Sequence, residues 1–265
     1  MQLLNRPLVK WLLKEEPPPS TPLCDYERIC YEIRPCDVLL VEGRSRLSDV
    51  IQVITRSPWS HSALYIGRSQ DIENLHIRQF IEDNYDGSPQ DQLVIEGYLG
   101  QGTVINLLDD YKYSHIRICR PRGLSRKDVQ QVIAYAASKV GSAYNVRQIF
   151  DLFRLLLPWT ILPRSWRSSL FHHNLGDPTR TVCSTMIAEA FNVVDFPILP
   201  DLHTSEDGKM ALHIRNPRLF TPRDFDYSPY FEIIKYPFIS IDDHMPAYKN
   251  LPWQKGRPQD LPTEK

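Results

Sequence analysis

The sequence predicts an α+β fold in which an antiparallel sheet is packed by helices. Three observations support this prediction. Strand-like runs dominate residues 37–121, helix-like runs follow from Ser125, and one further strand-like run, "YFEIIKYPFI", returns near the end of the chain. The 265 residues are enough for one large domain or two small ones, with a substantial hydrophobic core.

Composition and charge exclude several classes of protein. The chain is 42% hydrophobic and 24% charged, which excludes wholesale disorder, collagen-like repeats and coiled coils. Its net charge of -1 provides no basic field for nucleic acid, so we expect no nucleic-acid partner. No run reaches the roughly 18 apolar residues of a membrane span, and no signal-peptide cleavage site follows "MQLLNRPLVKWLLKEE". We therefore expect a cytoplasmic protein, with peripheral membrane contact and oligomeric state left open.

The chain divides into three parts. Residues 1–22 are predicted to form an amphipathic helix that ends at the proline spacer "PPPS". Residues 23–240 are expected to form the α+β domain, and residues 241–265 a polar, proline-rich tail.

Short apolar runs bounded by turn residues predict the strands of the sheet. Residues 68–91 are polar and lie between two of these runs, so they are expected to form a surface excursion. The strand candidates before the helical region are "DVLLVE" (37–42), "SALYIG" (62–67), "LVIEGY" (93–98), "TVINLL" (103–108) and "HIRICRP" (115–121).

Three helices are predicted after the strands. The first begins at Ser125, a good N-cap with Asp128 in the first turn, and is expected to end at Gly141. The second is predicted over residues 145–158. The third is predicted in "TVCSTMIAEAFNVV", where apolar residues follow the cysteine at helical spacing.

The cysteines and paired histidines give no sign of a metal site. Five cysteines in a chain of this length do not suggest a disulfide framework. Cys24, Cys30 and Cys36 are evenly spaced, which raises a zinc reading, but no CxxC pair or nearby histidine supports it. His172 and His173 lack a carboxylate at suitable spacing and are interpreted as loop residues. We predict neither a metal nor another cofactor.

Cys183 is the candidate nucleophile. With Thr181 as N-cap, Cys183 falls in the first turn of its predicted helix, where the helix dipole and unpaired N–H groups favour a thiolate. The alternative is a buried cysteine that packs as a small hydrophobe.

His61 and Glu96 are candidate partners of that thiol. His61 opens a predicted strand and shares a face with Ala63 and Tyr65, so it could reach a helix N-terminus packed on the sheet. Glu96 lies in an otherwise apolar strand, where burying a carboxylate is costly unless it is paired. A hydrogen bond to the second nitrogen of the imidazole would provide that pairing. The alternatives are a structural histidine at a strand edge and a glutamate that faces water.

The ordered set "TRSPWSHSALYIG", "VIEGYLGQGTVINLLDDY", "GSAYN" and "TVCSTMIAEAF" resembles the circularly permuted, papain-like branch of the NlpC superfamily, the YaeF/YiiX type. The resemblance extends over residues 33–236. It implies a permuted papain-like (NlpC-type) fold, in which a small antiparallel sheet is packed by helices around a cysteine hydrolase or acyl-transfer centre. His61 and Cys183 match the family's pair directly, in the order His then Cys, and Glu96 matches its third polar position.

The resemblance also implies substrate-binding residues near the centre. Tyr144, in "GSAYN", resembles a tyrosine that lies near the site in relatives. Trp59, Ser60 and Tyr65 flank or follow the histidine in its motif, and we expect them to contact substrate.

The function expected from these residues is a cysteine hydrolase of the amidase or peptidase type, which cleaves an amide of a peptide or amino-acid conjugate through an acyl-enzyme. One alternative is an acyl-lipid esterase or acyltransferase that uses the same pair. Residues 146–166 are strongly apolar and are expected either to be core or to form an apolar wall of the substrate cleft. The other alternative is a non-catalytic module that binds a peptide or lipid.

Overall fold

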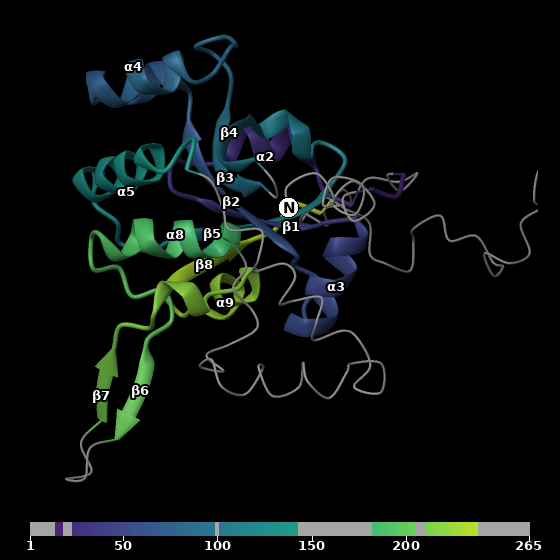
Figure 1. The fold of residues 1–265 in the computed structure, drawn as a ribbon, viewed down its shortest axis with the longest axis vertical. Coiled ribbons are helices and arrows are strands. Elements are labelled where there is room, and N and C mark those ends of the chain that lie inside the picture. Colours follow the sequence, from purple (N-terminus) through teal and green to yellow (C-terminus); the bar gives the residue numbers. More distant parts are fainter. Residues whose placement is uncertain (1–13, 18–22, 99–100, 143–181, 205–209, 238–265) are drawn as a thin grey trace, which may run out of the picture.

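The computed structural model describes residues 14–17, 23–98, 101–142, 182–204 and 210–237. Its centre is a six-stranded antiparallel sheet in the order β4-β3-β2-β1-β5-β8 (Figure 1). A separate two-stranded hairpin, β6–β7, projects from the body (Figure 1). The strands are β1 Val38–Glu42, β2 His61–Gly67, β3 Leu93–Tyr98, β4 Gly102–Leu107, β5 His115–Pro121, β6 Asp201–Thr204, β7 Met210–His213 and β8 Phe231–Ile234.

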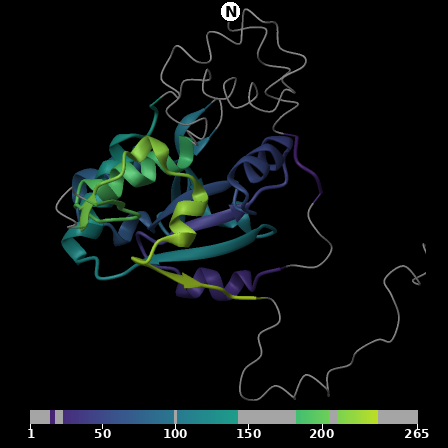
Figure 2. The same cartoon turned by 90° about the horizontal axis from the view of Figure 1, so that it is seen from below.

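Helices cover both faces of the sheet, with α5, α8 and α9 on one face and α2 on the other (Figure 2). Successive residues of a strand point to opposite faces, so Leu40 packs into the first layer and Leu39 into the second. Because both faces are covered, the strands are continuous apolar runs in the sequence. The helices are α2 Tyr26–Glu32, α3 Arg46–Thr55, α4 Leu75–Asp83, α5 Arg126–Ser138, α8 Val182–Asn192 and α9 Pro222–Tyr227, with short 3₁₀ turns at Ser69–Asp71 (η1), Leu108–Tyr111 (η2) and Pro217–Leu219 (η3).

The α+β prediction is confirmed, and the strands of the sheet lie where the apolar runs predict them, within a few residues at their ends. The predicted cap of α5 is also present. The Ser125 hydroxyl accepts a hydrogen bond from the Asp128 N–H, and the Asp128 carboxylate accepts one from the Ser125 N–H. Helix α5 ends at Ser138, however, and Gly141 lies in the turn that follows, with a left-handed φ of 78°.

The interpretation of residues 68–91 as a surface excursion is wrong in part. This segment contains η1 and α4, and Ile72 and Ile81 are buried in the core on the α5 side of the sheet. The Asn74 side chain caps α4 by accepting hydrogen bonds from the N–H groups of His76 and Ile77. This segment has too few apolar residues among its polar ones for a helical pattern to be recognised.

The sequence pattern also does not predict helices α2, α3 and α9 or the β6–β7 hairpin.

Several predicted features lie outside the described residues: most of the N-terminal helix, the helix over 145–158, Tyr144, His172, His173, and the tail over 241–265. Residues 14–17 are described and are not helical, because Glu15 forms an isolated β-bridge with Ser45. The predicted domain boundaries stay predictions.

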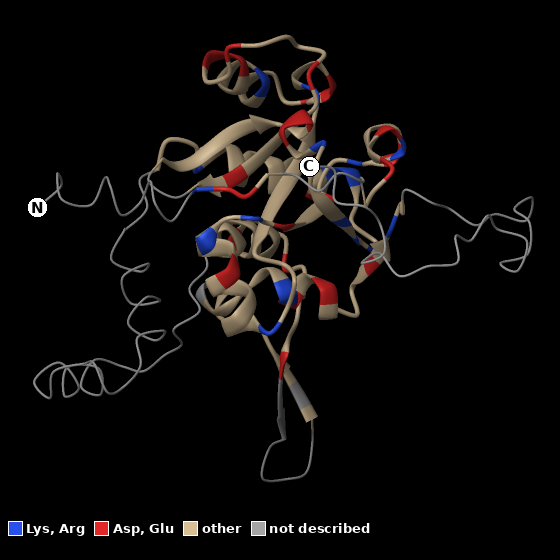
Figure 3. Cartoon of the chain, turned by 90° about the vertical axis from the view of Figure 1, so that its right-hand side faces the viewer, with Lys and Arg blue, Asp and Glu red and all other residues tan. Residues whose placement is uncertain are grey.

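Surface character agrees with the near-neutral composition. Figure 3 shows both signs of charge spread through the described helices and strands. Within the same part of the chain, no helix has the length and apolarity needed to cross a bilayer.

A buried ion pair links β1 to β5 at the end of the sheet where β1 begins. The Asp37 carboxylate accepts hydrogen bonds from Arg120 at 2.8 and 3.0 Å and from the Arg34 N–H at 2.8 Å. Its side chain is 1% exposed and that of Arg120 is 13% exposed. Loss of one partner would therefore leave a buried charge without compensation.

We expect Asp37→Ala to lower the free energy of unfolding by about 3–5 kcal/mol, because the Arg120 guanidinium is left unpaired. Urea unfolding monitored by circular dichroism measures this change. The control is Glu15→Gln. Glu15 lies 3.9 Å from Arg44 and its side chain is 63% exposed. Loss of this ion pair should lower the free energy of unfolding by less than about 1 kcal/mol. Equal effects of the two substitutions would contradict the prediction.

Candidate active site

The candidate site lies at the end of the sheet where β2 begins and β3 finishes. The two strands are antiparallel, and Ala63 pairs with Glu96. His61 and Glu96 therefore lie on neighbouring strands, close to the same end of the sheet. Ala63, Tyr65 and Val94 belong to the layer under α2, which places His61 and Glu96 on that face of their strands. The predicted face of His61 is confirmed.

Glu96 is a buried carboxylate with a full set of partners. It is 1% exposed. One oxygen accepts hydrogen bonds from the Tyr111 hydroxyl at 2.6 Å and contacts His61 Nε2, and the other accepts from Asn106 Nδ2 at 2.7 Å. Burial opposes ionisation, but the His61 charge and these hydrogen bonds outweigh it and lower the pKa of Glu96. Burial and the neighbouring carboxylate raise the pKa of Tyr111, so its hydroxyl remains a donor.

His61 is held on two sides. Nε2 is bonded to Glu96, and the ring stacks on Tyr111 with centroids 6.4 Å apart and planes 21° apart. The ring also interacts electrostatically with the Cys183 side chain, and Nδ1 is the nitrogen that the bond to Glu96 leaves available. Burial favours the neutral ring, yet the charges of Cys183 and Glu96 raise the pKa of His61 to about 10.

Cys183 approaches from the other face of the sheet, in the first turn of α8. Helix α8 packs on β2 and β3, and Met186, Ile187 and Ala190 are buried as the helical spacing predicts. Burial raises the pKa of the thiol, but the charge and hydrogen bond of His61, together with hydrogen bonds from Ser62, lower it to about 7 from an ordinary value of 9.0. The helix N-terminus acts in the same direction.

A pair of buried serines lies beside the thiol. Ser184 Oγ is 3.9 Å from Cys183 Sγ and 3.2 Å from Ser62 Oγ. Both serines are 0% exposed. The two hydroxyls form a small buried polar cluster beside the sulfur atom.

Four residues of this site were not identified from the sequence: Ser62, Asn106, Tyr111 and Ser184. Three of them carry a signal that could have found them, because each is a polar residue inside an otherwise apolar strand or helix. Asn106 lies in β4 opposite Val94, diagonal to Glu96. Tyr111 lies in η2, a turn with no such pattern.

The residues predicted to bind substrate have other contacts. Trp59 is 1% exposed, and its indole N–H donates to Asp226 at 3.2 Å. The hydroxyl of Ser60 accepts from the Gly43 N–H at 2.9 Å, and the hydroxyl of Tyr65 accepts from Gln92 at 2.9 Å. These bonds hold Trp59, Ser60 and Tyr65 in place, and their contact with substrate stays a prediction.

The described residues contain no group of three or more histidine, cysteine or acidic side chains arranged to hold a metal ion. In particular, Cys24, Cys30 and Cys36 form no such cluster, and the Cys24 thiol donates instead to the Ile116 carbonyl at 3.4 Å.

Comparison with known proteins relates this geometry to a family. Residues 32–151 match the sequence model of a family described as "Permuted papain-like amidase enzyme, YaeF/YiiX, C92 family". The match confirms the resemblance predicted from the sequence and supports a cysteine hydrolase of the amidase type. It includes His61 and Glu96 and ends before Cys183.

The chain is also similar to a solved structure described as the metalloprotein yiiX from Escherichia coli O157:H7, with a TM-score of 0.45 and 13% identity over 77% of this chain and 97% of that one. A comparison with curated proteins found no match.

We expect alkylation of Cys183 by iodoacetamide to rise with pH around a midpoint of about 7, because the thiolate is the reactive form and His61 stabilises it. Mass spectrometry of digests taken over time measures the rate at each cysteine. In His61→Ala the midpoint should rise, since burial of the thiol is then opposed only by Ser62 and the helix N-terminus. Faster labelling of Cys24, Cys36 or Cys119 in the folded protein would contradict the assignment, because burial raises the pKa of each of these thiols.

Proposed function

We propose that this protein is a cysteine amidase that cleaves an amide of a peptide or amino-acid conjugate through a thioester on Cys183. The observation that carries the proposal is the position of the Cys183 thiol in the first turn of α8, beside an imidazole that a buried carboxylate holds in place. These surroundings lower the pKa of the thiol to about 7. The family match over residues 32–151 supports an amide as the bond that is cleaved.

In the first half of the reaction, the Cys183 thiolate attacks the carbonyl carbon of the substrate. A C–S bond forms and the carbonyl electron pair moves to oxygen. N–H groups at the start of α8, which helix geometry leaves without an acceptor inside the helix, are suitable donors to this oxyanion. As the intermediate collapses, the C–N bond breaks and His61 donates its Nδ1 proton to the departing amine, which leaves a thioester.

In the second half, His61 is neutral and acts as the base. It removes a proton from water while the water oxygen attacks the thioester carbon. The C–S bond then breaks, a carboxylic acid is released, and the thiolate and imidazolium are restored. Glu96 does not exchange a proton in this scheme. It stabilises the imidazolium and fixes the ring orientation through Nε2.

The same pair could act on an acyl ester or thioester, or transfer the acyl group to an acceptor other than water. The apolar sequence of residues 146–166, which lies outside the described part of the chain, is the reason to test long-chain acyl substrates beside peptides. Tyr144 stays a proposed substrate contact. A non-catalytic module would form no thioester, so trapping of an acyl group on Cys183 distinguishes that alternative.

We expect Cys183→Ala to abolish turnover of a peptide amide. Glu96→Gln should lower kcat by roughly 10²-fold with little change in KM, because it affects the imidazole rather than substrate binding. This loss is smaller than the roughly 10⁴-fold typical of the buried aspartate in a serine triad, since Cys183 does not need a base to form its nucleophile. A continuous assay of amine release measures both parameters.

A matched control is Glu42→Gln. Glu42 pairs with His115 at 2.6 Å at the same end of the sheet, but their side chains are 39% and 35% exposed and neither contacts the thiol. This variant should keep kcat within about twofold of the unmodified protein. The proposal is wrong if Cys183→Ala retains turnover, and the role of Glu96 is wrong if its substitution behaves like that of Glu42.

A further inference from the structure

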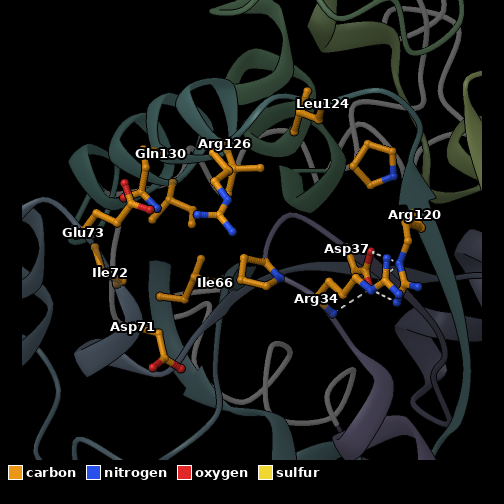
Figure 4. Close-up of a pocket in the computed structure, with 14 residues that line it drawn as sticks. Arg34, Asp37, Ile66, Asp71, Ile72, Glu73, Arg120, Leu124, Arg126 and Gln130 are labelled. Atoms are coloured by element: carbon orange, nitrogen blue, oxygen red, sulfur yellow. Dashed lines mark hydrogen bonds and ion pairs between the residues drawn. The ribbon is translucent and has the colours of Figure 1, made fainter.

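A cavity lies at the far end of β2 from the thiol, with a volume of about 610 Å³ (Figure 4). Its wall includes Ile66, which is five residues along β2 from His61 and therefore about 16 Å away along the strand. The remaining wall comes from the turn before β1, the segment around η1, the end of β5, and α5. No residue of the proposed mechanism lines this cavity.

The cavity has a basic side. Asp37 is bonded to Arg120 and lies near the Arg34 side chain, so this group of two guanidiniums and one carboxylate carries one net positive charge. Arg126, at the start of α5, adds a second positive charge (Figure 4). Within the described residues, neither the Arg34 nor the Arg126 side chain forms a hydrogen bond or ion pair, so both remain available to a carboxylate.

Asp71 and Glu73 form an acidic side opposite Arg34 and Arg120 (Figure 4). Asp71 has only a long, exposed contact of 3.8 Å with Arg68. Glu73 forms no ion pair with any described residue.

Between the charged sides the wall is apolar. Leu124 and Val129 are half-buried and form its apolar surface, and Ile66, Ile72 and Ile133, each 1% exposed, belong to the core beneath. The volume lies in the range of small-molecule sites, which combine apolar walls with a few polar groups that fix orientation.

We propose that this cavity binds a short zwitterionic peptide, of dipeptide size with an apolar side chain, at a site separate from the thiol centre. The ligand carboxylate lies toward Arg34 and Arg126, and the ammonium group toward Asp71 and Glu73. The apolar side chain packs on Leu124 and Val129. This inference goes beyond the proposed amidase activity and does not depend on it.

The test is isothermal titration calorimetry of L-alanyl-L-leucine into the full chain after Cys183 has been alkylated with iodoacetamide. Alkylation blocks the thiol centre and prevents turnover, so binding that survives it is binding elsewhere. We expect a Kd of about 1 mM or tighter. The N-acetylated, C-amidated form of the same dipeptide lacks both charges and should bind at least about tenfold more weakly.

Two substitutions locate the site. Arg126→Gln and Glu73→Gln each remove one charge and should weaken binding of the zwitterion about tenfold. Lys127→Gln is the matched control, because Lys127 is the exposed neighbour of Arg126 on α5 and does not line the cavity. Thermal melting of each variant confirms that it is folded.

The proposal is overturned by any of three results: no heat of binding at about 10 mM dipeptide, equal affinity for the charged and blocked dipeptides, or loss of binding on alkylation of Cys183. The last result would place the dipeptide at the thiol centre, and it would leave the amidase proposal standing.

Discussion

The catalytic geometry depends on a charge buried in the sheet, the carboxylate of Glu96. Such a charge is stable only while its oxygens are paired, and Asn106, Tyr111 and His61 provide that pairing. The dependence runs outward from there. Asn106 and Tyr111 hold the carboxylate, the carboxylate holds the imidazole, and the imidazole ionises the thiol. Removal of the Tyr111 hydroxyl would therefore change the reactivity of Cys183, although Tyr111 donates its hydrogen bond to Glu96 and not to the thiol.

The alternation of side chains along β2 explains how one strand serves both halves of the centre. His61 points to the face covered by α2, together with Ala63 and Tyr65. Ser62 points to the opposite face, where it reaches Ser184 on α8. The imidazole and the thiol thus come from opposite faces of the sheet. They meet at the end of the sheet where β2 begins, because no strand separates the two faces beyond that point. This is the physical reason for an ionisable residue at the first position of an apolar strand.

The spacing of apolar and polar residues predicts most strands of the sheet and the positions of the three central site residues. It does not predict the short helices or the residues that act from turns. Period-two and helical spacing were sufficient for the strands of the sheet, for α5 and α8, and for the placement of His61, Glu96 and Cys183. Short helices such as α2 and α9 have too few turns for a periodic signal. Tyr111 acts from a 3₁₀ turn whose position follows only from tertiary packing. Trp59 and Tyr65, two residues before and four residues after His61, are buried and hydrogen bond to Asp226 and Gln92, contacts that residue pattern does not reveal.

The topology also orders the assembly of the centre in time. Strands β2, β3 and β4 and turn η2 follow one another along the chain, so His61, Glu96, Asn106 and Tyr111 are joined by contacts of short sequence separation. Cys183 arrives on α8, more than a hundred residues after the histidine, and closing that loop is entropically slower. During synthesis the residues of the acid–base half are therefore made before the cysteine. The thiol gains its activating partner only when α8 packs on β2 and β3.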